Sequence, residues 1–148
     1  FANNDLSVMP HISSDPSLHV CLPEAQPVLR TVPMPADTNY AGDIFGGWLM
    51  SQIDIAGAIA AAQRTKGPVV TVAVKELKFL QPLFIYDIAS FYTKVTTVGK
   101  TSVTVEVEVY AERYQEGVNL SAHIKVSEAS LVYVAVSKPG KKRLIPTE

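Results

Sequence analysis

The spacing of apolar positions changes once along the chain, near residue 68, and the change separates a predicted helix from predicted strands. From about Gly46 to Gly67-Pro68, apolar residues recur every three or four positions, which is the pattern of a helix. Small and apolar residues also fall beside this stripe, so we expect a long helix that is buried over most of its girth. The apolar positions are Leu49, Met50, Ile53, Ala56, Gly57, Ile59 and Ala60.

After Pro68 the period becomes two, which is typical of strands with one buried face. A short strand is expected at 28–32, before the helix, and long strands are expected at about 69–81, about 87–97, from about 102, and at about 119–136. Alternation is cleanest where Val103, Val105, Val107 and Val109 alternate with polar residues. In the first long strand Val70, Val72 and Val74 share a face that Leu77 and Phe79 do not, which predicts a bulge near residues 75–76. Turns are predicted at 98–100 and 115–117.

This order of elements predicts an α+β fold, an antiparallel sheet wrapped around one long central helix. The edge strands of such a sheet expose unpaired backbone groups, which are commonly covered by a second copy of the chain. At 148 residues the chain suits one domain, which we place at 28–148. Residues 1–27 carry four prolines among polar residues and no period, so we expect a poorly ordered arm along the surface.

The composition limits the kinds of partner that the protein is expected to bind. A hydrophobic fraction of 47% and a mean hydropathy of +0.16 favour extra buried surface, such as a subunit interface. A net charge of -1 offers no broad attraction to nucleic acid or to an anionic membrane. No apolar run approaches the roughly 20 residues that span a bilayer, so we expect no membrane insertion. The N-terminal residues lack a secretory pattern and the sequence has one cysteine, so we expect a cytoplasmic protein. The irregular spacing of His11, His19 and Cys21 argues against a metal site.

The candidate chemistry lies at the start of the predicted helix, in a layout suited to reaction at a carbonyl. Asp43 precedes Gly46-Gly47, where helix N–H groups and the helix dipole favour negative charge. As a general base or nucleophile Asp43 would carry the reaction, and its structural alternative is a helix cap. The amides of Gly46 and Gly47 suit an oxyanion hole, or the glycines serve a tight turn. Asn39 either orients a reactant or forms an Asx turn.

Other chemistry-bearing residues have simpler interpretations. We expect Asp54, within the helix, to reach solvent or an interface partner, with catalysis as the lesser alternative. His123 falls on the polar phase of the last strand and is expected to be exposed. Phe45 and Trp48 are expected to pack in the core or at a subunit seam. Neither a Gly-x-Ser-x-Gly motif nor a phosphate loop, dinucleotide fingerprint or zinc spacing occurs, so Asp43 has to supply the chemistry.

Two runs, MPADTN at 34–39 and GDIFGGWLMSQID at 42–54, resemble the hot-dog-fold acyl-CoA thioesterases, in particular the small bacterial YciA-like enzymes. The similarity continues at 69–72, 79–82, 127–129 and 133–136, and covers residues 28–146. The resemblance implies hydrolysis of an acyl-CoA thioester to free CoA and a fatty or other carboxylic acid, with CoA entering as part of the substrate and no separate cofactor. It also implies a homodimer with shared active sites, often assembled into a trimer of dimers, which is a homohexamer.

In that family setting Asp43 would activate water or attack the thioester, beside Asn39 and the Gly46 and Gly47 amides. One departure is Gln81, where a basic residue is common in relatives. Two alternatives remain open: an acyl-CoA-binding or sensing protein without turnover, and a hydratase or dehydratase of the same fold, which would want a histidine near the helix start. Substrate contacts are expected from Leu49, Ile53, Thr71, Phe79, Lys141, Lys142 and Arg143, the last three for the CoA phosphates.

Overall fold

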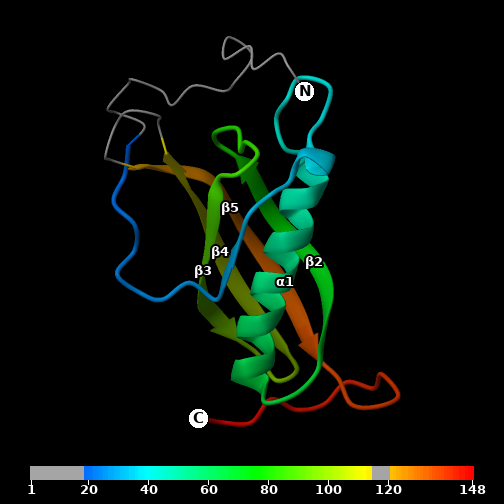
Figure 1. Cartoon of the computed structure of the whole chain (residues 1–148). Coiled ribbons are helices and arrows are strands. Elements are labelled where there is room, and N and C mark those ends of the chain that lie inside the picture. The colour runs from blue at the N-terminus through cyan, green and yellow to red at the C-terminus, as the bar shows by residue number, and fades with distance from the viewer. Residues whose placement is uncertain (1–18, 115–120) are drawn as a thin grey trace, which may run out of the picture.

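The computed structural model describes residues 19–114 and 121–148, and it shows one five-stranded antiparallel sheet curved around one helix (Figure 1). The strands lie in the order β1-β3-β4-β5-β2, so β1 and β2 form the two edges. The predicted hot-dog architecture is therefore confirmed. The elements are β1 (Leu29–Thr31), a 3-10 turn η3 (Pro35–Asp37), α1 (Gly46–Thr65), β2 (Val69–Phe79), β3 (Ile88–Val98), β4 (Ser102–Tyr114) and β5 (Ser121–Ala135).

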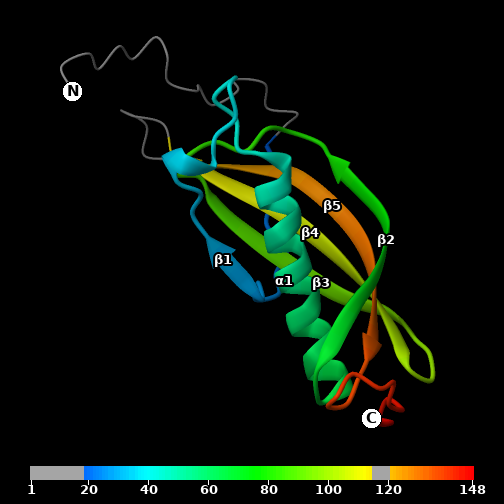
Figure 2. The same cartoon turned by 90° about the vertical axis from the view of Figure 1, so that its right-hand side faces the viewer.

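The core lies between α1 and the concave face of the sheet, as Figure 2 shows from the side. The alternating valines of β4 supply its centre: Val103 is 1% exposed and Val105, Val107 and Val109 are 0% exposed, as their spacing predicted. Against them α1 contributes a stripe of mostly small residues, which lets the helix approach the strands closely. The buried residues of α1 are Leu49, Ile53, Ala56, Gly57, Ala60, Ala61 and Thr65.

The end of the helix agrees with the sequence prediction, whereas its outer side does not. Lys66 adopts a left-handed conformation (φ 56°) and caps α1, so the helix ends at Thr65, just before the Gly67-Pro68 pair that was predicted to stop it. Met50 and Ile55 are 45% and 46% exposed. The expectation of burial over most of the girth is therefore wrong for the single protomer, because the sheet covers only one side of α1.

The edge strand β2 is only partly covered within the protomer. Every one of its residues is exposed or half-buried, including Val70, Val72 and Val74. Its register against β5 shifts between Val74 and Glu76, which confirms the predicted bulge, and shifts again between Thr71 and Ala73. An apolar edge strand of this length is a surface that proteins normally cover.

The first described residues of the N-terminal arm lie beside β5. The Val20 N–H donates to the His123 carbonyl at 2.8 Å, and His19 forms a bridge with Ile124. The His123 ring lies 3.4 Å from a Glu112 carboxylate oxygen and is half-buried rather than exposed. The prediction for residues 1–18, the turn at 115–117 and the first residues of the last predicted strand lie outside the described residues.

Candidate active site

The loop before α1 is organised by Asn39. Its side-chain oxygen accepts hydrogen bonds from the Ala41 N–H at 2.9 Å and the Asp43 N–H at 3.1 Å, and its own N–H donates to the Asp43 carbonyl at 2.7 Å. This is the Asx turn that the sequence left open for Asn39. Since the oxygen is engaged by the loop, only the side-chain NH₂ of Asn39 is left to meet a reactant.

Asp43 sits half-buried in this loop, and its carboxylate accepts no hydrogen bond among the described residues. It does not cap α1, because Phe45 occupies that position and α1 has no side-chain cap. Hydrogen bonding into the helix begins at Trp48, whose N–H donates to the Phe45 carbonyl at 3.1 Å. The N–H groups of Gly46 and Gly47 come before it and find no acceptor in the described part of the chain.

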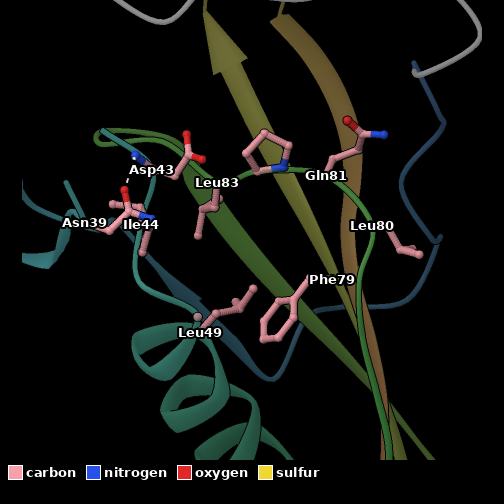
Figure 3. Close-up of a pocket in the computed structure, with 10 residues that line it drawn as sticks. Asn39, Asp43, Ile44, Leu49, Phe79, Leu80, Gln81 and Leu83 are labelled. Carbon is pink, nitrogen blue, oxygen red and sulfur yellow. Dashed lines mark hydrogen bonds between the residues drawn. The ribbon is translucent and has the colours of Figure 1, made fainter. Parts of the chain in front are cut away.

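A cavity of about 350 Å³ brings together five of the predicted site residues, Asn39, Asp43, Gly46, Leu49 and Phe79, and Phe79 closes its lower side (Figure 3). The remaining wall is the loop that follows β2, from Leu80 to Leu83, and it includes Gln81. Gly46 packs closely against Phe79, since a Cβ at this position would lie 3.2 Å from the Phe79 ring.

The loop at residues 80–87 is held in place from the sheet side by a buried ion pair. Arg113 of β4 donates to both carboxylate oxygens of Asp87, at 2.9 and 2.7 Å, and also to the Pro82 carbonyl at 3.2 Å. Its guanidinium lies 4.3 Å from the centre of the Phe84 ring, and Asp87 in turn accepts the Phe84 N–H at 2.9 Å. The wall of the first cavity thus depends on residues that do not line it.

A second cavity, of about 310 Å³, opens between α1, β2 and β5. Asp54 faces it from the third turn of α1, about 12 Å along the axis from the first helical residue. Asp54 Oδ1 accepts hydrogen bonds from the Thr71 hydroxyl at 2.7 Å and the Tyr133 hydroxyl at 3.1 Å. The lining is otherwise apolar or small: Gly47, Met50, Ser51, Ile53, Thr71, Val74, Leu77, Ala129 and Leu131.

Tyr133 is the largest fully buried side chain in the described residues, with 0% of its surface exposed. Its pKa is raised, first by burial, then by the negative charge of Asp54 and by the hydrogen bond to it. The Tyr133 hydroxyl therefore stays protonated and remains a hydrogen-bond donor throughout the neutral range.

The predicted substrate residues divide among three places. Leu49 and Phe79 line the first cavity, whereas Ile53 and Thr71 line the second. The basic tail lies near the C-terminal end of α1, away from Asp43 within the protomer (Figure 1). Arg143 is engaged there: it donates to the Thr65 carbonyl at 2.6 Å and the Val136 carbonyl at 2.8 Å, which leaves Lys141 and Lys142 as the exposed cations.

The sequence prediction for Asp54 was solvent or an interface partner, whereas the structure pairs it with Thr71 and with Tyr133, which the sequence did not single out. The signal for Asp54 was present, because it is the only charged residue between positions 46 and 63 of an otherwise apolar and small-residue helix. A charge kept in such a setting needs partners. The partners come from β2 and β5, which only the tertiary structure brings to the helix.

No cluster of three or more metal-ligating side chains occurs in the described residues. Within the same residues, no helix is both long and apolar enough to cross a membrane.

Comparison with known proteins gives consistent matches. A family model described as "Thioesterase superfamily" matches residues 41–118. The acyl-CoA thioester hydrolase YciA of Escherichia coli (strain K12) is 45% identical over 127 residues, which cover 86% of this chain and 96% of that protein. A hexameric hotdog-fold thioesterase of Campylobacter jejuni superposes with a TM-score of 0.79 at 48% identity, and the match covers 82% of this chain and 91% of that one.

An acyl-CoA hydrolase from Staphylococcus aureus, solved with butyryl coenzyme A, coenzyme A and coenzyme A disulfide, superposes with a TM-score of 0.71 at 30% identity. The match covers 80% of this chain and 70% of that one. Three further structures of that hydrolase each carry alanine in place of one residue: a threonine, an asparagine and an aspartate. The helix, the sheet around it and the extent of these matches agree, and the chain belongs to the thioesterase superfamily as a hot-dog-fold acyl-CoA thioester hydrolase of the YciA type.

Proposed function

We propose that this protein hydrolyses acyl-CoA to free CoA and a carboxylic acid, and that Asp54 rather than Asp43 is the carboxylate that carries the reaction. The observation behind this choice is the hydrogen-bonded position of Asp54 at the wall of an apolar cavity that Gly47 also lines. A carboxylate oriented by donors beside an apolar cavity is suited to act on a bound thioester. Asp43 faces a cavity as well, but no donor among the described residues orients its carboxylate.

The substituted residues of the Staphylococcus aureus hydrolase support Asp54 independently. Along that chain the asparagine, aspartate and threonine stand at the same intervals as Asn39, Asp54 and Thr71 stand here. Asp43 does not fit this series. The correspondence also supports the predictions that Asn39 and Thr71 belong to the site.

In the proposed reaction the Asp54 carboxylate takes a proton from water while the water oxygen attacks the thioester carbonyl carbon. The negative charge that develops on the carbonyl oxygen is stabilised by N–H groups at the start of α1, Gly47 first because it lines the same cavity. The intermediate collapses by breaking the carbon–sulfur bond, and Asp54 returns the proton to the CoA thiolate. Direct attack by Asp54 to form an anhydride, followed by hydrolysis, uses the same residues.

The assembly is proposed to be a hexamer, like the hexameric Campylobacter jejuni relative, and its building unit is proposed to be a dimer. The support within this chain is the uncovered apolar surface on β2 and the adjacent side of α1, where Val70, Val72, Val74, Met50 and Ile55 are each about half exposed. A second copy that covers this surface would also close the mouth of the cavity beside Asp54, since Met50 and Val74 line it.

Thiol release from short-, medium- and long-chain acyl-CoAs by wild type, Asp54→Asn and Asp43→Asn tests the proposal. Asn keeps an oxygen that accepts from Thr71 and Tyr133, so the fold is expected to survive. The expected result is a loss of at least about 100-fold for Asp54→Asn and less than about 10-fold for Asp43→Asn, with acyl-CoA binding retained by both.

The reverse ranking would return the role to Asp43. If wild type binds acyl-CoA without releasing thiol, the protein is a sensor rather than an enzyme, and the proposed function is wrong. Circular dichroism of each variant confirms that it is folded before the rates are compared.

A further inference from the structure

Asp54 is held by hydroxyl groups from two neighbouring strands of the sheet. Thr71 of β2 and Tyr133 of β5 both donate to the same oxygen, Oδ1, at 2.7 and 3.1 Å. The Tyr133 hydroxyl also lies 2.9 Å from the Asp54 backbone carbonyl, so its proton is shared between the carboxylate and the helix backbone. Oδ2 has no hydrogen-bond partner among the described residues.

The position of the Tyr133 hydroxyl depends on a glycine in the middle of α1. A Cβ built on Gly57 would overlap the Tyr133 hydroxyl and lie 2.9 Å from the ring carbon that bears it. Glycine inside a helix costs about 1 kcal/mol relative to alanine, so its place here is explained by the close approach of the tyrosine. Gly57 is one helical turn beyond Asp54 and lies on the same side of α1.

Among the residues that the structure describes, no charged side chain other than Asp54 lines this cavity. Asp54 is the only titratable residue that lines the cavity within the described part of the chain, and Tyr133, from the sheet below, is the titratable residue in contact with it. Because burial and the Asp54 charge raise the pKa of Tyr133, its hydroxyl does not ionise under assay conditions. It is therefore a permanent donor.

We propose that Tyr133 is a positioning residue of the thioesterase reaction: together with Thr71 it fixes Oδ1 of Asp54, so that Oδ2 is the oxygen presented to water or thioester. The inference rests on the proposed role of Asp54. Tyr133 touches no substrate in this arrangement, and it acts through the orientation of the carboxylate.

The test compares Tyr133→Phe with Tyr110→Phe in the wild-type background. Tyr110 is a matched control because it is also buried and also donates to a carboxylate, but that carboxylate is Glu108, at 2.6 Å, and not Asp54. We expect Tyr133→Phe to lower kcat by about 10-fold or more and to leave KM within about twofold, since the loss of a hydrogen bond to a charged group is of this size. Tyr110→Phe should leave both constants within about twofold.

A second comparison places Tyr133→Phe in the Asp54→Asn background. If the tyrosine acts through the carboxylate, the substitution should cause no further loss there, whereas a purely structural defect would lower both backgrounds equally. Wild-type kcat for Tyr133→Phe, or an equal loss in both backgrounds, overturns the positioning role while the proposed function stands. Full activity of Asp54→Asn overturns the proposed role of Asp54 and this inference with it.

Discussion

From the structure we predict how much stability the protein loses when the buried ion pair between Arg113 and Asp87 is broken. The two side chains are 9% and 3% exposed and share two hydrogen bonds, while Arg113 also bonds Pro82 and Asp87 accepts the Phe84 N–H. Arg113→Met removes the cation and keeps much of the side-chain volume, so Asp87 is left as a buried charge with one donor. Breaking a buried pair in this way costs about 3–5 kcal/mol, a large fraction of the roughly 5–15 kcal/mol that stabilises a domain.

Urea unfolding at fixed protein concentration measures the cost, since assembly makes stability depend on concentration. With a slope of about 2 kcal/mol/M, the midpoint should fall by about 2 M. Arg30→Met is the matched control: Arg30 pairs with Glu112 at 3.2 Å, but its side chain is 53% exposed, and such a pair contributes at most about 1 kcal/mol.

A double-mutant cycle sharpens the test. Asp87→Asn keeps an acceptor for the Phe84 N–H and removes the buried negative charge, so Arg113→Met with Asp87→Asn should be less destabilised than the two single variants predict together, by up to about 3 kcal/mol. A loss for Arg113→Met no greater than that for Arg30→Met, or strict additivity in the cycle, would refute the reasoning. The single variant should also raise KM, because the loop that it loosens forms a wall of the first cavity.

Three further outcomes are expected. Gly57→Ala should lower kcat and cost about 1–3 kcal/mol in urea unfolding, because the overlap with Tyr133 outweighs the gain in helix propensity; a stabilised variant of unchanged activity would contradict this. The pKa values of Tyr110 and Tyr133 are raised, so above pH of about 10 the unfolded chain loses protons that the folded chain keeps. The free energy of unfolding should therefore fall by about 1.4 kcal/mol per pH unit for each tyrosine. Tyr133→Phe should show a shallower fall, and a pH profile identical to that of wild type would contradict the raised pKa of Tyr133. Arg143→Gln should lower the melting temperature without changing KM, because the guanidinium is bonded to Thr65; a stable variant with a raised KM would instead support phosphate binding.

The sequence by itself determined the order and type of the elements. A helix of twenty residues and strands with alternating valines are local patterns, and their period is set by backbone geometry, which does not depend on what packs against them. The bulge between Val74 and Glu76 was readable for the same reason, since a change of phase along one strand is visible in the sequence alone. The helix start, with its unbonded glycine amides, was readable from the Gly-Gly pair.

The choice between Asp43 and Asp54 depended on the tertiary structure. Asp43 precedes α1 and Asp54 lies within it, and sequence position favoured Asp43 because it is beside the glycines. What distinguishes them is the set of donors on Asp54, which come from Thr71 and Tyr133, 17 and 79 positions further along the chain. Contacts over such separations leave no periodic trace in the sequence, because they arise only when β2 and β5 pair and close over the helix. For the same physical reason, the engagement of Arg143 with the end of α1 was not visible before the chain was folded.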